Sequence, residues 1–197
     1  MNNKKPSLYL EKGLNIQLNE TVEKMINEYC AIKLFSKESI LLLQGECASN
    51  LYFIIKGLIR GYYIDEEGKD ITKCFALENE FFSSEGFRTN KASTFHIESL
   101  EDSTCIQIPY HLLRMIMAEH GDVYKIFNQY LLTVFQQLED RSRDFAMKSA
   151  KDRYIEFIEQ YPELEKRIPQ NIIASYIGIR AGSLSRIKKQ IKIKIQN

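Results

Sequence analysis

The sequence predicts an α+β fold in three parts: an N-terminal antiparallel β-roll of the jelly-roll type, a long central helix and a C-terminal helix-turn-helix. Short runs rich in β-branched and aromatic residues, separated by Gly, Asn and Asp, fill residues 39–108. A helical pattern without an internal proline follows Pro109, and two short amphipathic helices flank a glycine in residues 168–191. Evenly spaced short strands indicate an antiparallel roll or barrel, and the 3.6-residue periods indicate the helices.

The N-terminal half begins with a predicted helix over residues 18–35, where Val22, Ile26 and Tyr29 recur at helical spacing. Six strands are predicted after it, over residues 40–43, 51–56, 58–64, 70–77, 94–99 and 104–108. The third and fourth strands are joined by Asp-Glu-Glu-Gly-Lys, in which Gly68 suits a positive φ. These two strands are therefore expected to form a hairpin.

The long helical pattern covers residues 110–143 and carries two apolar stripes. The first stripe consists of Val123, Phe127, Tyr130 and Val134, and the second consists of Tyr124, Leu131, Phe135 and Leu138. We predict that one stripe covers the roll while the first stripe forms the seam of a homodimer, because that stripe is too long for one roll to cover. The alternative is a helix that is buried entirely within one chain.

A further helical pattern over residues 150–161 ends at Pro162, and it separates the long helix from the C-terminal module. The predicted domains are therefore residues 1–109 for the roll, 110–144 for the long helix and 145–197 for the helix-turn-helix domain.

The first helix of the C-terminal module begins near Pro169, which suits a first helical turn, and its apolar face ends at Gly178, which suits a left-handed turn. The second helix directs Leu184, Ile187 and Ile191 inward. Its other face carries Ser183, Ser185, Arg186, Lys188 and Lys189. Small hydroxyls and cations suit a reader of the DNA major groove, because Arg pairs bidentately with guanine and Lys meets phosphates. The alternative is a solvated amphipathic hairpin.

The charges are distributed unevenly along the chain. It has 27 basic and 26 acidic residues, and eight of the basic residues but none of the acidic ones lie from Lys166 onward. This end therefore carries +8 and residues 1–165 carry −7, which indicates a polyanion as the partner of the basic end. RNA recognition favours exposed aromatic residues among the cations, whereas Tyr176 lies on the predicted buried face. Double-stranded DNA is the predicted partner.

Composition and motifs exclude several classes of protein. The chain is 44% hydrophobic and 27% charged, as is typical of globular proteins, and the sequence carries neither a signal-peptide core nor a membrane-spanning run. We therefore expect a cytoplasmic protein with no membrane partner. The cysteines lack the Cys-x-x-Cys spacing of a metal site and are expected to be reduced thiols. Without a nucleophile elbow, phosphate loop or metal-ligand cluster, no catalytic residue, metal or enzymatic activity is predicted.

Three segments together resemble the Crp/Fnr family of bacterial transcription regulators, in a style similar to its Bacteroidetes representatives. They are LYFIIKGLIRGYYIDEEGKDITKCF, the long helix, and RYIEFIEQYPELEKRIPQNIIASYIGIRAGSLSRIKK. The resemblance covers nearly the whole chain. It implies a cyclic-nucleotide-binding-like β-roll as the sensor, a dimerising central helix, a winged helix-turn-helix, and RNA polymerase as a further partner.

By this resemblance, Gln170 and Asn171 at the start of the first helix contact phosphates, and the exposed face of the second helix contacts bases and phosphates. Ala181 and Gly182 depart from the family, whose members often carry larger polar residues there, so fewer base contacts or a different operator are expected. The predicted DNA-binding residues are Gln170, Asn171, Arg180, Ser183, Ser185, Arg186, Lys188 and Lys189.

The resemblance also implies an effector pocket in the roll, but its phosphate cassette departs from the family. Cyclic-nucleotide binders carry Gly-Glu-Leu followed by Arg-Ser or Arg-Thr, whereas this chain has Glu-Phe-Phe-Ser-Ser-Glu over residues 80–85 and then Ser93-Thr94. A buried phosphate without a cation is poorly compensated, so cyclic AMP is not expected to bind unless Arg88 or Lys91 supplies the charge. The predicted pocket residues are Phe81, Phe82, Ser83, Ser84, Glu85, Arg88, Ser93 and Thr94.

No cofactor is predicted. The aromatic residues of the cassette indicate an apolar effector, a filled pocket or plain core. The iron–sulfur sensors of the family use an N-terminal cysteine cluster that this chain lacks. Haem bound through His96, His111 or His120 is a disfavoured alternative, because lone histidines are more often core or surface residues.

The predicted function is that of a sequence-specific DNA-binding transcription regulator, which reads a palindromic site as a homodimer under an effector other than cyclic AMP. The alternative is a regulatory module that binds a cyclic nucleotide or another small molecule, and whose basic tail binds RNA or a protein.

Overall fold

The computed structural model describes residues 5–89 and 91–195, and the chain divides into two compact units. The first unit comprises Met1–Tyr63 and Lys73–Ile126, and the second comprises Ile64–Thr72 and Phe127–Asn197. These boundaries differ from the predicted ones after residues 109 and 144. The helical spacing of apolar residues predicts how far a helix extends but not which parts of the chain pack against it. It therefore cannot predict a unit boundary that falls inside a long helix or across a β-hairpin.

Two helices precede the sheets, α1 (Pro6–Leu14) and α2 (Glu20–Tyr29). The proline of α1 stands in the first turn, where a missing N–H costs nothing. The Asn19 side chain caps α2 by accepting a hydrogen bond from Val22 N at 2.9 Å. The observed helix therefore starts at Glu20, two residues after the predicted start at residue 18.

The predicted helix over residues 18–35 is wrong beyond Tyr29, because residues 31–35 form strand β1. Ile32 pairs with Ile106 and Leu34 pairs with Thr104, both of β8, in an antiparallel register. The helical spacing around Tyr29 masked this change of period.

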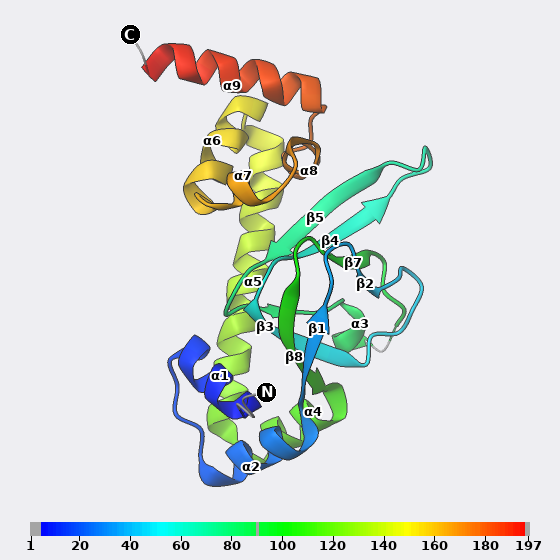
Figure 1. The fold of residues 1–197 in the computed structure, drawn as a ribbon, viewed down its shortest axis with the longest axis vertical. Coiled ribbons are helices and arrows are strands. Elements are labelled where there is room, and N and C mark those ends of the chain that lie inside the picture. The colour runs from blue at the N-terminus through cyan, green and yellow to red at the C-terminus, as the bar shows by residue number, and fades with distance from the viewer. Residues whose placement is uncertain (1–4, 90, 196–197) are drawn as a thin grey trace. The chain divides into compact units, whose positions relative to one another are not determined.

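The strands lie in two four-stranded sheets, with orders β1-β8-β3-β6 and β2-β7-β4-β5; Figure 1 labels all of these strands except β6. The pairs β1/β8, β3/β8, β3/β6, β2/β7 and β4/β7 are antiparallel, so the predicted antiparallel roll is confirmed. The six predicted strands match β2, β3, β4, β5, β7 and β8 to within two residues. The bounds are β1 Ala31–Phe35, β2 Ile40–Leu42, β3 Asn50–Lys56, β4 Ile59–Ile64, β5 Asp70–Ala76, β6 Phe81–Phe82, β7 His96–Ser99 and β8 Ser103–Pro109.

Apolar side chains from both sheets fill the interior of the roll. The buried cluster consists of Ile54, Ile59, Ala76, Phe82, Phe95, Ile97 and Cys105. Gly61 faces this cluster, where a Cβ would lie 3.0 Å from Phe95 Cε2 and 2.9 Å from Cys74 Sγ. Large aromatic side chains therefore fit only because β4 contributes no side chain at this point.

The predicted single helix over residues 110–144 is two helices, α4 (Tyr110–Glu119) and α5 (Gly121–Met147). They are separated at His120, which has an extended φ of −125° and ψ of 94° and caps α4 through its N–H to Ile116 O at 2.8 Å. The helical spacing of apolar residues continues across His120, so the sequence alone did not reveal a one-residue break between the two helices. A short helix, α3 (Gly86–Thr89), lies between β6 and β7.

The second unit contains the tip of the β4–β5 hairpin and the helices from α5 onward. The tip turns at Gly68, with φ +78°, and the Asp65 side chain accepts hydrogen bonds from Glu67 N and Lys69 N. The positive φ predicted for Gly68 is confirmed. The remaining helices are α6 (Ala150–Gln160), α7 (Leu164–Arg167), α8 (Gln170–Tyr176) and α9 (Ala181–Ile195).

The wing predicted for the helix-turn-helix does not occur in the described part of the second unit. No strand occurs between α5 and residue 195, so the wing of a winged helix-turn-helix is not part of the described residues. Among the helices of residues 5–89 and 91–195, none is both long and apolar enough to cross a membrane.

Candidate nucleic-acid interface and sensor corner

A C-terminal capping motif fixes the turn between α8 and α9. Ile179 N donates to Ala174 O at 2.9 Å and Gly178 N donates to Ser175 O at 3.1 Å, so two carbonyls at the end of α8 are satisfied. Gly178 has φ +75°, and a Cβ built on it would lie 2.4 Å from Phe145 Cε1. Both the backbone conformation and the space therefore require glycine, and the predicted tight turn is confirmed.

Two arginines from other helices hold the same end of α8. Arg141 of α5 donates to Tyr176 O at 2.8 Å, and Arg153 of α6 donates to Ile177 O at 3.0 Å. The ring of Phe145 lies 5.0 Å from the guanidinium carbon of Arg141 and 4.7 Å from that of Arg153. Because carbonyls at a helix C-terminus carry partial negative charge, these cations stabilise α8 and set the direction in which α9 leaves it.

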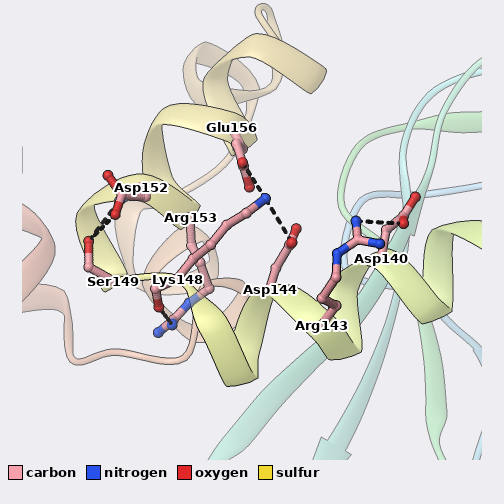
Figure 2. A network of polar contacts seen from close by, with 8 residues as sticks. All are labelled: Asp140, Arg143, Asp144, Lys148, Ser149, Asp152, Arg153 and Glu156. Atoms are coloured by element: carbon pink, nitrogen blue, oxygen red, sulfur yellow. Dashed lines mark hydrogen bonds and ion pairs between the residues drawn. The ribbon is translucent and has the colours of Figure 1, made fainter.

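The junction of α5 and α6 is a network of ion pairs and a helix cap (Figure 2). Lys148 pairs with Asp144 of α5 at 2.7 Å and also with Glu156 of α6. The hydrogen bond to Asp144 and then that to Glu156 raise the pKa of Lys148 above its ordinary value. Ser149 caps α6 by accepting from Asp152 N at 3.2 Å. Both sides of the junction are thereby tied to one lysine.

The hairpin tip forms hydrogen bonds with α8 within the second unit. Thr72 N donates to Ser175 Oγ at 2.8 Å, and that hydroxyl donates to Asp70 O at 3.1 Å. Arg141 donates to Thr72 O at 3.3 Å as well as to Tyr176 O. Ser175 thus acts as both acceptor and donor for one strand end, a role that the sequence did not indicate.

α9 presents a polar face to solvent, and Leu184, with none of its surface exposed, anchors the opposite face. Its first turn is closed by hydrogen bonds from Ser183 N and Leu184 N to Arg180 O, at 2.9 and 3.2 Å. Seven of the eight predicted DNA-binding residues are exposed: Gln170, Asn171, Arg180, Ser183, Ser185, Arg186 and Lys189.

Lys188 differs from the other seven. Its Nζ lies 2.5 Å from Glu165 Oε1 of α7, and its side chain is only 20% exposed. The same carboxylate oxygen accepts a hydrogen bond from Tyr154 of α6 at 2.5 Å. Burial, followed by this bond, raises the pKa of Tyr154. Lys188 therefore ties α9 to α7 and α6, and we revise its predicted role from a phosphate contact to a structural anchor.

Gln190 was not among the predicted residues, although it is exposed one turn beyond Arg186 on the same face of α9. The i, i+4 spacing from Arg186 was the available signal. A glutamine amide can pair bidentately with adenine, so Gln190 extends the candidate reading face.

The two stripes of α5 have the opposite exposures to those predicted. Phe127 is 7% exposed, and Val123, Tyr130 and Val134 of the same stripe are half-buried. In the second stripe and beside it, the exposed residues are Tyr124 at 55%, Leu132 at 54%, Phe135 at 58% and Leu138 at 45%. Because Phe127 is buried within its own chain and cannot face a partner, we revise the predicted dimer seam from the first stripe to the more exposed second stripe. The two stripes are similarly apolar, so the sequence alone does not show which of them packs against the rest of the chain.

The predicted pocket residues of the roll do not line one space. Phe82 is part of the interior cluster, but Phe81 packs against Phe53, with 5.2 Å between ring centroids. Ser83 donates to Asn50 O at 2.9 Å and also bonds the hydroxyl of Tyr110, whose pKa burial raises to about 12. Neighbouring residues of β6 point to opposite sides, as strand residues must. The side chain of Arg88 lies outside the described residues.

Ser93 and Thr94 have separate roles. The Ser93 hydroxyl donates to Phe95 O at 2.7 Å and accepts from Phe95 N at 3.3 Å, so it serves the loop before β7. The Thr94 backbone N–H and hydroxyl instead both donate to Glu85 Oε1, the former at 2.9 Å. Ser84 is buried and accepts from Gly86 N at 3.3 Å.

Cys30 and Cys105 are buried, and His96 has structural partners. Burial raises the pKa of both Cys30 and Cys105 to about 12, so their thiols stay protonated at neutral pH. His96 accepts from Gln44 N at 3.3 Å and stacks on Tyr62. No group of three or more metal-ligating side chains occurs in the described part of the chain.

Comparisons with known proteins agree with this arrangement of sheets and helices. A family model described as a cyclic nucleotide-binding domain matches residues 32–120. The cAMP-activated global transcriptional regulator CRP of Pasteurella multocida is 21% identical over 186 residues, which cover 89% of this chain and 88% of that protein. A further relative is the HTH-type transcriptional regulator ArcR of Staphylococcus aureus, which is 21% identical over 83% of this chain and 74% of its own length.

Solved structures show the same fold. FixK2 from Bradyrhizobium japonicum has a TM-score of 0.75 at 16% identity, over 84% of this chain and 85% of that one. A Crp/Fnr-family transcriptional regulator from Eubacterium rectale has a TM-score of 0.73 at 20% identity, over 90% and 85% of the two chains. Residues 32–120 thus match a cyclic nucleotide-binding domain, and the chain, with its helix-turn-helix after that domain, is similar in fold to these transcription regulators, one of them of the Crp/Fnr family.

Proposed function

We propose that the protein is a sequence-specific DNA-binding transcription regulator that reads a palindromic site as a homodimer. The observation that carries this proposal is the exposed face of α9, where Ser183, Arg186 and Lys189 project beside the exposed start of α8. No acidic residue occurs from Lys166 to the C-terminus, so this segment carries a net positive charge that attracts a polyanion. This supports DNA as the partner rather than a protein of mixed charge.

The seam of the proposed dimer is the second stripe of α5. Tyr124, Leu131, Phe135 and Leu138 recur at spacings of 7, 4 and 3, as in a coiled-coil seam, and the same repeat places Asn128 between the first two. Phe135 and Leu138 are 58% and 45% exposed, so a second copy of α5 would bury apolar surface that water now meets. A parallel pairing would give the two recognition helices two-fold symmetry.

The effector of the roll is proposed to be something other than cyclic AMP. Ser93, at the position where cyclic-nucleotide binders place arginine, already exchanges two hydrogen bonds with Phe95. Calorimetry with millimolar cyclic AMP is therefore expected to show no saturable heat. A dissociation constant in the micromolar range would contradict this part of the proposal.

The decisive experiment for DNA binding is selection of bound duplexes from a random pool, with and without small-molecule cell extract. We expect enrichment of an inverted repeat. Selection from a matched single-stranded RNA pool is the control, because the alternative function predicts that RNA is retained equally well. Enrichment of RNA without any duplex preference would sink the proposal. A cytoplasmic location and contact with RNA polymerase remain predictions.

A further inference from the structure

The exposed seam of α5 contains an amide side chain between its apolar residues. The spacings along the seam put Tyr124, Leu131 and Leu138 at the d positions of a heptad repeat. Phe135 then lies at an a position, and the a position of the preceding heptad is Asn128. Asn128 is exposed, as are Tyr124 and Phe135 on either side of it. A polar group therefore lies at a position where a partner helix would bury it.

The contacts of the chain itself do not account for Asn128. It lies beyond the first turn of α5, so it does not cap the helix, and asparagine is a weak helix former. Within residues 5–89 and 91–195, no group forms a hydrogen bond with its side chain. Other exposed polar side chains of α5 bond locally: Thr133 donates to Gln129 O at 3.1 Å, and Gln136 donates to Asp140 at 3.1 Å. The amide of Asn128 is thus available to a partner.

An asparagine side chain is complementary to a second copy of itself. Its amide has N–H donors and a carbonyl acceptor, so two amides that meet at a two-fold axis can each satisfy the other. A parallel, in-register pair of α5 helices brings residue 128 of both chains face to face. A shift by one heptad would bury the amide against Phe135, where it finds no partner, and burial of an unpaired amide is unfavourable. An antiparallel pair along the whole seam would move Asn128 toward the other end of the seam. Of these arrangements, only the parallel, in-register one satisfies both amides.

We infer that Asn128 pairs with Asn128 of a second copy of the chain and thereby favours the parallel, in-register dimer, at a cost in the strength of that dimer. The inference rests on the proposed homodimer and deepens it, because the apolar residues of the seam alone would also permit shifted or antiparallel alignments. Alignment matters for the proposed palindrome reader, since a two-fold pair of α5 helices relates the two copies of α9 by the same axis.

Charge complementation between two full-length variants tests whether the two residues meet. Asn128→Asp and Asn128→Lys should each raise the dissociation constant of the dimer about a hundredfold or more, because like charges then face each other across the seam. An equal mixture of the two variants should restore the dimer, since a carboxylate then faces an ammonium. Sedimentation over a concentration series measures each sample. Gln129→Asp and Gln129→Lys are the matched controls, because they add the same charges one residue away, at an exposed position off the seam, and each should dimerise as the native protein does.

Asn128→Leu should change the dimer in the opposite direction. Leucine buries apolar surface where the amide was, so the dissociation constant should fall about tenfold or more. Circular dichroism checks that every variant is folded, as expected for substitutions at an exposed position.

Two outcomes would overturn the inference alone: a mixture of the Asp and Lys variants that stays monomeric while the native protein is a dimer, or an Asn128→Leu dimer of native strength. A native protein that sediments as a monomer would overturn the proposed homodimer and this inference with it. All these measurements are made without DNA, so a failure of DNA binding leaves their outcome unchanged.

Discussion

Arg186 and Lys189 are both exposed on α9, but their chemistry separates their expected roles. A guanidinium can pair bidentately with guanine, whereas a lysine ammonium meets phosphates as a point charge. We expect Arg186→Ala to cost about 1–3 kcal/mol on the specific duplex and to relax the preference at one base position. Lys189→Ala should weaken all duplexes alike and reduce the salt slope by about one unit per lost phosphate contact. Titrations on specific and scrambled duplexes over a salt series measure both effects, and an exchange of the two outcomes would invert the assignment.

Lys188 should behave as a structural residue, because its ammonium is paired with Glu165. We expect Lys188→Met to lower the free energy of unfolding by about 1–3 kcal/mol, since the charged hydrogen bond between Lys188 and Glu165 is lost. Lys189→Met is the control, because an exposed substitution normally changes stability by less than about 0.5 kcal/mol. Urea unfolding gives both values. If Lys188→Met instead changes the salt slope of DNA binding and leaves the free energy of unfolding unchanged, Lys188 contacts a phosphate as first predicted.

At the scale of elements, the α8–α9 turn depends on one glycine. Gly178→Ala would force a side chain into a left-handed backbone, at about 1–2 kcal/mol, and would add a contact that overpacks Phe145, at roughly 1–3 kcal/mol. Gly182→Ala is a matched control, because no atom lies within 4 Å of its Cβ position and alanine favours a helix by about 0.5–1 kcal/mol. Thermal unfolding should therefore show opposite signs for the two variants. Equal effects would mean that the turn tolerates alanine.

The exposed stripe of α5 makes a second prediction at this scale. Phe135→Asp with Leu138→Asp should give a folded monomer, because like charges would face each other across the seam. Thr133→Asp with Gln137→Asp, which adds the same charge at exposed positions off the seam, should remain dimeric. Sedimentation measures the mass of each variant. Phe127→Asp should unfold the chain rather than divide a dimer, since Phe127 is buried. A dimer that survives the change at 135 and 138 would place the seam elsewhere.

For the whole molecule, a two-fold dimer should bind half-sites whose centres lie about one helical turn, ~34 Å, apart, because its recognition helices enter successive major grooves. Extra base pairs amounting to about half a helical turn between the half-sites should reduce binding strongly, since they move the second half-site to the opposite face of the duplex. Mobility-shift titrations compare the spacings. The monomeric α5 variant is the control and should be insensitive to spacing. A native protein that is equally insensitive would not be a palindrome reader.

The sequence by itself determined the features that depend on neighbouring residues. The alternation of short strands, Gly68 in the hairpin, Gly178 in the turn and the basic segment from Lys166 could all be read locally, because strand period, positive φ and net charge are properties of short stretches. The exposure of seven of the eight predicted interface residues follows from the same 3.6-residue period.

Only the tertiary structure decided which of two similar features meets solvent and which meets the chain. It showed that the first stripe of α5 is more buried than the second, and that Lys188 is bound to Glu165 while Lys189 is exposed. It also brought Glu85 to Thr94, nine residues later. In each case the burial or pairing of a side chain depends on residues distant in the sequence. Neither composition nor helical period shows which distant residues are brought together by folding.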